Sequence, residues 1–351
     1  GGGTYTISSS NGITVDTVAP ILPVPTMLAE PAYTSGTVNI VSCNTVSDPV
    51  SGGVTYYFEC STSSTFATIS ANSGWITATT HTFTSLNDGI TYYFRVRARD
   101  AVLNTSGNSA SVNSIQDSFP PTATAYTDNV ASNNDPDQQW SRDATVYFAA
   151  SGLSDPGAVK SGVSDVFVEI SNSSLFDTTP LWSGLTGNTT GAKTFTVASP
   201  VDGNVIYARA QYIDVAGNRS STWQTTDGIM LDLINPMAGA TTDLMPGNDD
   251  RDHTISSDSW IYFGFSHSDE ASGIATVTIQ IATDPGFTVS TYAILAGQPT
   301  SYVYKYGEDG KTYYARIMVQ DKSDRFSNPL YGSPSDGIKV DLTPPVPTAA
   351  S

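Results

Sequence analysis

The chain has 351 residues, with 33 acidic and 15 basic side chains and a formal net charge of −18. A nucleic-acid partner needs clustered lysine and arginine, so this charge argues against one. Five glutamates, six lysines and 14 leucines leave few strong helix formers, while Val, Ile, Thr, Tyr and Phe, which favour strands, are common. No apolar run reaches the ~18–20 residues that span a bilayer, so we expect no membrane insertion.

A short phrase that ends in aspartate recurs along the chain and is followed each time by proline. The aspartates are Asp16, Asp117, Asp232 and Asp341, at intervals of 117−16 = 101, 232−117 = 115 and 341−232 = 109 residues. Intervals of this size suit one β-sandwich each. We therefore predict a terminal strand that resembles the end of a preceding repeat (1–16), three sandwiches (17–118, 119–233 and 234–342) and a linker that opens a further repeat (343–351).

The two ends of the chain resemble parts of a repeat. Residues 4–16 match a repeat's tail, and 341–351 resemble the opening of the first unit. One interpretation is a window from a longer tandem array. The other is a complete subunit, identical copies of which join into a filament when the strand at 4–16 completes a neighbour's sheet.

Alternation of apolar and polar residues predicts the strands in each unit. The first strand of the first unit is expected to face inward with Val38 and Ile40. The inward residues of the following strands are Tyr56, Phe58 and Cys60, then Phe94 and Val96; in the second unit Val146, Phe148, Val166, Val168 and Ile170; in the third Ile261, Phe263, Phe265, Val277, Ile279 and Ile281. About seven short strands per unit without a helical stretch predict an all-β chain of three tandem antiparallel sandwiches in an elongated array.

A second phrase, Asp-Gly followed by Tyr, Arg and Asp at fixed spacing, occurs once in each unit. Arg95, Arg209 and Arg316 lie beside inward residues and should face outward. Glu59 and Glu169, in an earlier strand of their units, should face outward as well. The flanking Tyr93, Tyr207 and Tyr314 either pack around the arginine stems or form a ligand platform, and packing is the favoured interpretation.

Residues 86–98, Leu-Asn-Asp-Gly-Ile-Thr-Tyr-Tyr-Phe-Arg-Val-Arg-Ala, resemble the E–F corner and strand F of fibronectin type III domains. The phrase at 214–220 and the linker at 341–345 are similar to those of tandem fibronectin type III or immunoglobulin-like repeats in bacterial extracellular and surface proteins. Unit two departs from the pattern with Ile206 in place of the corner tyrosine. The resemblance also implies that strands C and F are neighbours, so we expect two cross-strand surface pairs, Glu59–Arg95 and Glu169–Arg209. It implies spacer, adhesion or accessory modules without a single chemistry, so function must be argued from sites.

Two acidic loops, at 127–148 and 242–263, align without gaps. Calcium takes six to eight oxygen ligands, which such loops can supply, and an ion bound there would brace neighbouring domains. The alternative is a solvated loop of turn-capping side chains. The candidate calcium ligands are Asp128, Asn133, Asp135, Asp137 and Asp143 in unit two, and Asp243, Asn248, Asp250, Asp252 and Asp258 in unit three.

A Ser-Gly pair at 161–162 and 272–273 follows Asp155 and Asp269. It either extends an ion site or makes a turn into the next strand, and the turn is favoured. The two cysteines, Cys43 and Cys60, are expected on opposite faces as unpaired thiols, although a disulfide that closes this short loop is the alternative.

Nothing in the sequence supports catalysis. His81, His253 and His267 are scattered and form neither a zinc motif nor a triad. We therefore expect a non-enzymatic structural or spacer array at the cell surface, without a required cofactor, whose partners are neighbouring repeats or identical subunits. The alternatives are a self-assembling filament subunit and a carbohydrate-binding adhesin or accessory module of a secreted enzyme, with a surface glycan or protein receptor as its partner.

Overall fold

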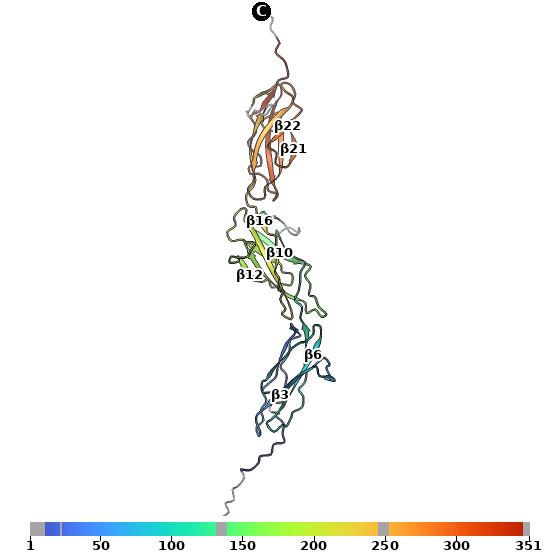
Figure 1. Ribbon diagram of the computed structural model, residues 1–351. Coiled ribbons are helices and arrows are strands. Elements are labelled where there is room, and N and C mark those ends of the chain that lie inside the picture. Colours follow the sequence, from blue (N-terminus) through green and yellow to red (C-terminus); the bar gives the residue numbers. More distant parts are fainter. Residues whose placement is uncertain (1–10, 22, 131–138, 245–252, 347–351) are drawn as a thin grey trace, which may run out of the picture.

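The computed structural model describes residues 11–21, 23–130, 139–244 and 253–346, in which every regular element is a β-strand. Three sandwiches follow one another along an elongated molecule (Figure 1). Each has its own hydrophobic core, drawn from residues 27–112, 123–233 and 238–340. Within the described ranges, no helix combines the length and apolarity needed to cross a membrane.

The first sandwich packs a five-stranded sheet, in the order β1-β7-β6-β3-β4, against the pair β2-β5. In this first sandwich we letter β2, β3, β4, β5, β6 and β7 as strands B, C, C′, E, F and G. Its strands are β1 (Tyr33–Ser35), β2 (Asn39–Ser42), β3 (Thr55–Ser61), β4 (Ala71–Ile76), β5 (Thr80–Phe83), β6 (Thr91–Arg99) and β7 (Val112–Asp117).

The second sandwich repeats this plan with the sheets β13-β10-β8 and β12-β11-β14-β16-β9, and β15 pairs with β14 beside that path. Its strands are β8 (Ala125–Val130), β9 (Trp140–Ser141), β10 (Thr145–Ser151), β11 (Val163–Ser171), β12 (Trp182–Leu185), β13 (Lys193–Thr196), β14 (Val205–Asp214), β15 (Gln224–Thr225) and β16 (Ile229–Leu231).

The third sandwich has the sheets β17-β19-β22 and β18-β24-β23-β20-β21. In all three units the pairing is antiparallel except for one short parallel contact with the last strand, made by β1, β9 and β18. The strands are β17 (Met237–Leu244), β18 (Ile255–Ser256), β19 (Ile261–Ser268), β20 (Ile274–Ala282), β21 (Ser290–Ala296), β22 (Ser301–Tyr304), β23 (Thr312–Asp321) and β24 (Ile338–Val340).

Strand F is β6 in the first unit, β14 in the second and β23 in the third, and each confirms the predicted alternation. In β6 the residues Phe94, Val96 and Ala98 are fully buried, and the residues between them are only partly covered. The corner tyrosines also lie as the resemblance implies: Tyr92 Oη accepts a hydrogen bond from Asn87 N at 3.0 Å. In unit two, the buried Ile206 fills the same position without that bond.

The predicted facing of the first unit's early strand is wrong. Val38 and Ile40 are exposed, by 42% and 64%, whereas Asn39 and Val41 of β2 are buried. The residues that correspond to Val146 and Phe148 of the second unit are Asn39 and Val41, one position later than predicted. A shift of one residue turns every side chain of a strand to the other face. Asn39 is tolerated inside because its amide donates a hydrogen bond to Thr34 Oγ1 at 3.3 Å.

This slip also moves Cys43 inward. Cys43 and Cys60 are both free and both belong to the first core, so the expectation that they lie on opposite faces is wrong. Burial raises the pKa of Cys43 to about 11 and that of Cys60 to about 12. Both thiols are therefore protonated in the folded protein near neutral pH, and a protonated thiol is a poor nucleophile.

Iodoacetamide at pH 8 should leave both cysteines unmodified in the native chain and alkylate both in denaturant, as mass spectrometry would show. Folding raises these pKa values, so their contribution to stability is complete below the unfolded pKa near 8.5 and is lost as the pH rises towards 11–12. The first sandwich should therefore lose stability above about pH 9. Rapid labelling of the native protein would contradict the burial of these thiols.

Candidate functional site

Each linker leaves its sandwich beside the Asp-Gly turn that precedes strand F. In every unit the aspartate Oδ1 of this turn accepts a hydrogen bond from a linker backbone N–H, so the start of the linker is fixed to the domain it leaves. The pairs are Asp88 with Ser118 at 2.8 Å, Asp202 with Leu233 at 2.6 Å, and Asp309 with Leu342 at 2.6 Å.

The junction between the first and second sandwiches is closed by hydrogen bonds from both sides. Asp88 Oδ2 accepts a bond from Ala158 N of the second sandwich at 3.1 Å. In return, Asn218 Oδ1 of the second sandwich accepts one from Gly36 N of the first, also at 3.1 Å. Gly89 is required here, because a Cβ on it would lie 2.7 Å from the Ala158 methyl group.

At the junction between the second and third sandwiches, Arg325 makes the hydrogen bonds that link the two sides. Its guanidinium donates to the carbonyl oxygen of Asp232 at 3.0 Å, to Asn235 Oδ1 at 3.0 Å and to the carbonyl oxygen of Arg142. One side chain of the third sandwich thus holds both the linker and the second sandwich.

Three aspartates meet at the end of each sandwich that receives a linker. One comes from the linker or the strand that leads into it, one from the loop between strands B and C, and one from the end of strand F. In each group, one oxygen from every aspartate lies within 4.8 Å of the others. The junction clusters are Asp16, Asp48 and Asp100; Asp117, Asp155 and Asp214; and Asp232, Asp269 and Asp321.

The residue four positions after the strand F aspartate holds the linker aspartate in place. Asn104 and Asn218 each donate from Nδ2 to its backbone carbonyl oxygen, at 3.1 Å for Asp16 and 2.8 Å for Asp117. In the third cluster this residue is Arg325, which reaches the same carbonyl through Nε. The side chains therefore bind the linker backbone and leave the linker carboxylates facing their two partners.

The loop aspartates use one oxygen to bind their own turn. Asp155 Oδ2 accepts a hydrogen bond from Gly162 N at 2.6 Å, and Asp269 Oδ2 accepts one from Gly273 N at 2.5 Å. The Ser-Gly phrase is thus a turn that also lies at the cluster. Ser161 N, in the same turn, donates to Asp117 Oδ2 at 2.9 Å.

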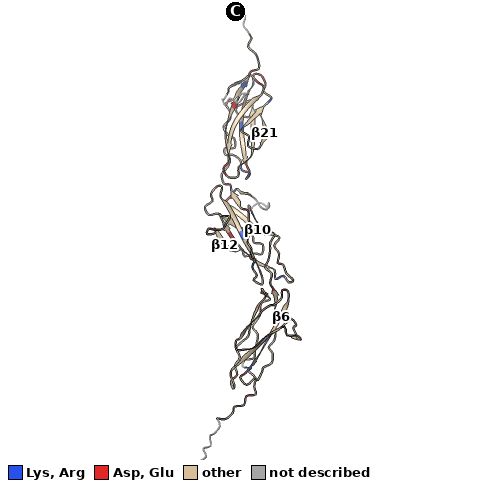
Figure 2. Cartoon of the chain, viewed as in Figure 1, with Lys and Arg blue, Asp and Glu red and all other residues tan. Residues whose placement is uncertain are grey.

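None of these aspartates forms an ion pair in the part of the chain that the structure describes. The ion pairs found there join Glu59 to Arg95 and Arg97, and Glu169 to Arg209. The chain has 15 lysines and arginines against 33 acidic residues, and Figure 2 colours both kinds along the cartoon. Each junction cluster therefore concentrates negative charge without a direct ion pair to a basic side chain.

Several cluster oxygens also have no hydrogen-bond partner. Both carboxylate oxygens of Asp232 are in this state, as are Asp155 Oδ1, Asp321 Oδ2 and Asp16 Oδ2. Asp232 and Asp321 are completely buried. A buried carboxylate without partners is costly, so these groups need either a proton or a cation.

The pKa values move in the direction that this crowding predicts. Burial raises the pKa of Asp155, a hydrogen bond from Gly162 opposes the rise, and the charges of Asp117 and Asp214 add to it. In the third cluster, burial and neighbouring aspartates raise the pKa of Asp269 and of Asp321.

The ten candidate calcium ligands of the acidic loops fall into two groups. Asn133, Asp135, Asp137, Asn248, Asp250 and Asp252 lie outside the described residues. Asp128 and Asp243 are buried, and each accepts a hydrogen bond on Oδ2 from the glycine before the last strand of its own sandwich, Gly228 at 3.1 Å and Gly337 at 2.9 Å. Asp143 and Asp258 lie in turns and bond through their N–H groups to Ser141 and Ser256. A calcium site in these loops stays a prediction.

The junction clusters were not predicted from the sequence, although eight of their nine aspartates belong to the recurring phrases. Asp16, Asp117 and Asp232 end the repeated phrase, Asp100, Asp214 and Asp321 close strand F, and Asp155 and Asp269 precede Ser-Gly. The clusters could have been inferred from the fold, because the linker aspartate, the B–C loop aspartate and the strand F aspartate all lie at the same end of the sandwich. Loops B–C and F–G share that end, and the incoming linker reaches it.

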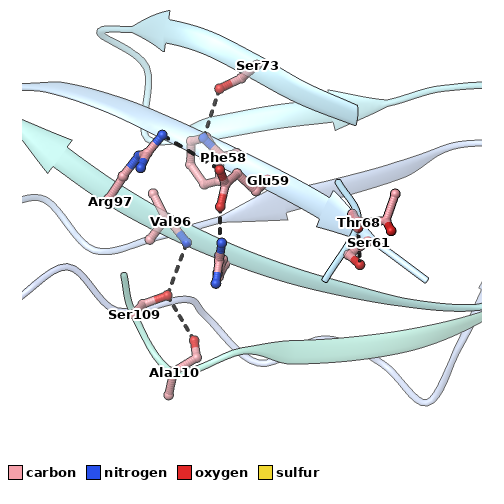
Figure 3. A network of polar contacts seen from close by, with 10 residues as sticks. Phe58, Glu59, Ser61, Thr68, Ser73, Val96, Arg97, Ser109 and Ala110 are labelled. Carbon is pink, nitrogen blue, oxygen red and sulfur yellow. Dashed lines mark hydrogen bonds and ion pairs between the residues drawn. The ribbon is translucent and has the colours of Figure 1, made fainter. Parts of the chain in front are cut away.

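The predicted cross-strand pairs are confirmed. Arg95 Nε donates to Glu59 Oε2 at 2.7 Å, and Arg209 Nη2 lies 2.6 Å from Glu169 Oε2. Figure 3 shows the side chains of Glu59 and Arg97 joined by a dashed line, and Arg97 Nη2 lies 3.6 Å from Glu59 Oε1. Glu59 belongs to β3, and both arginines belong to the neighbouring β6. Glu59 is only 6% exposed, so this is a buried pair rather than the surface pair expected.

The outward faces of these sheets are occupied by packed cations and rings. The Arg95 guanidinium stacks on Phe66 at 4.1 Å from the ring centroid, and Arg99 stacks on Trp75 at 4.2 Å. Tyr207 and Tyr314 lie against Gly228 and Gly337, where a Cβ would approach either ring to 2.4 Å. This arrangement matches sheet-face packing of the tyrosines.

No protein-family model matches the chain, and no curated protein matches its sequence. Among solved structures it is similar to the FN1–FN3 domains of chicken CNTN1, at 14% identity over 90% of this chain and 96% of that one, with a TM-score of 0.36. It is also similar to domains A168–A170 from titin, at 11% identity over 92% and 99% of the two chains, with a TM-score of 0.38. The chain's own sheets show an array of three tandem β-sandwiches, in which the pairing is mainly antiparallel.

Proposed function

We propose that the chain is a non-enzymatic spacer array of an extracellular surface protein, which holds another part of that protein at a distance. The observation that supports this most is the construction of the junctions. Each of the two junctions between sandwiches is tied to the domain before it and to the domain after it, as Asp88 and Asn218 do at the first. A rod formed in this way keeps its length better than domains on free linkers.

The composition fits an extracellular position. Asparagine, serine, threonine, glycine and aspartate are common in the sequence and lysine is rare, and a net charge of −18 makes neighbouring copies repel one another.

Small-angle scattering and negative-stain electron microscopy of the purified chain test the proposal. Ten-residue strands at ~3.3 Å per residue give units of about 33 Å, so three in line predict separate rods of about 100 Å. Fibres much longer than one chain would favour the filament subunit joined through residues 4–16. A compact particle with the sandwiches folded together would contradict the spacer.

A further inference from the structure

The strongest unassigned feature of the molecule is the set of three junction clusters. In the third, the buried Asp232 faces Asp269 and Asp321, and neither of its carboxylate oxygens has a hydrogen-bond partner. Hydrogen bonds within the protein therefore do not compensate for the burial of this carboxylate. The carboxylate faces the position that a cation bound by all three aspartates would occupy.

We propose that each junction cluster is a calcium site, and that calcium couples each linker to the sandwich it enters. This deepens the proposed spacer function and rests on it. In the second and third clusters, one carboxylate belongs to the connection from the preceding sandwich and two belong to the next one. An ion held by all three therefore joins two domains, because it is bound fully only when their relative position brings the carboxylates together.

The chemistry of the clusters fits calcium better than magnesium. Aspartate carboxylates are hard oxygen ligands, and three of them supply up to six oxygens. Mg²⁺ usually keeps several waters and binds only one or two carboxylates, whereas Ca²⁺ takes six to eight oxygens that several carboxylates can supply. The oxygens of each cluster lie within 4.8 Å of one another, close enough to bind one calcium ion together.

The three sites should differ in affinity because of the residue beside the linker carbonyl. Asn104 and Asn218 are neutral, but Arg325 brings a positive charge that contacts the backbone of a proposed ligand, Asp232. The positive charge of Arg325, held close to Asp232, would repel a calcium ion bound by that aspartate. We expect the third site to bind calcium about tenfold more weakly than the other two, or weaker still.

Isothermal titration of the full chelator-treated chain with calcium chloride, and separately with magnesium chloride, tests the proposal. The expected result is three calcium ions per chain, two bound more tightly than the third, with weaker magnesium binding. Asp117→Asn should remove one of the tight sites and Asp232→Asn should remove the weak one. Arg325→Asn should strengthen the weak site about tenfold.

The chain supplies a matched control in Asp341, which ends the same repeated phrase but is exposed. Asp341→Asn should leave the titration unchanged. Thermal unfolding in chelator verifies the fold of each variant, and loss of a crowded carboxylate should leave the melting temperature unchanged or higher. Calcium binding that survives the combined Asp16→Asn, Asp117→Asn and Asp232→Asn variant would overturn the proposal and favour the acidic loops.

Absence of calcium binding by the chelator-treated chain would also overturn the proposed sites. The spacer function is judged separately, by rod length in scattering and microscopy. A chain that forms rods of about 100 Å without binding calcium would keep the spacer and lose the ion sites. A chain that binds three calcium ions but folds into a compact particle would keep the ion sites and contradict the spacer function.

Discussion

Replacement of Phe148 by alanine should unfold the second sandwich and leave the other two folded. The ring is completely buried in the second core and stacks near Tyr126, with 6.4 Å between ring centroids. Loss of a buried phenylalanine costs about 3–5 kcal/mol, a large part of the stability of a domain of this size. The three cores share no residue, so the loss should stay within one unit.

Scanning calorimetry of the variant should show one transition at a much lower temperature and the remaining heat at its original position. Limited proteolysis at an intermediate temperature should then cut within 119–233 and spare the flanking sandwiches. Leu185→Ala is the matched control, because this leucine lies in the same sandwich but is 55% exposed. A single transition that shifts as a whole in Phe148→Ala would show instead that the three units unfold together.

Asn218→Ala should loosen the junction between the first and second sandwiches. Its side chain accepts a hydrogen bond from Gly36 N at 3.1 Å and donates bonds to the Asp117 carbonyl oxygen and to Asp214 Oδ2, both at 2.8 Å. Each such bond contributes about 0.5–1.5 kcal/mol, so the junction should lose about 1–3 kcal/mol. The two domains should then sample a wider range of angles.

Spin-label distance measurements check this expectation, with labels at Thr82→Cys in the first sandwich and Ser183→Cys in the second. Both positions are exposed, and the native thiols are buried. The distance distribution should broaden in Asn218→Ala. Asn104→Ala removes the corresponding side chain at the start of the first sandwich and should leave this distribution unchanged. Equal widths for both variants would mean that Asn218 does not control the junction.

Local patterns in the sequence were sufficient for the strands of the sheet that contains strand F. In β6, β14 and β23 every second residue is buried, as the alternation predicts, because one face of these strands packs on the core. The pairs Glu59–Arg95 and Glu169–Arg209 needed one more premise, the resemblance to fibronectin type III domains, which implied that their two strands are neighbours. The burial of Glu59 did not follow, because it depends on side chains from a third strand and a turn.

Strand β2 shows where pattern reasoning failed. Val38 and Ile40 are apolar and Asn39 is polar, yet Asn39 is buried and its neighbours are exposed. Apolar residues on an outer face are common, so alternation alone leaves two possible registers. The contacts of β2 with β5 and with the first core decided between them.

The sequence by itself determined the repeat, the all-β class and the facing of most strands, because each depends on residues close in the chain or on a regular period. Only the tertiary structure decided the junction clusters. Asp16 and Asp100 are 84 residues apart (100−16), and nothing local specifies that they meet. They meet because two loops share one end of the sandwich and the linker enters there, so the feature with the most chemistry lies where separate segments converge.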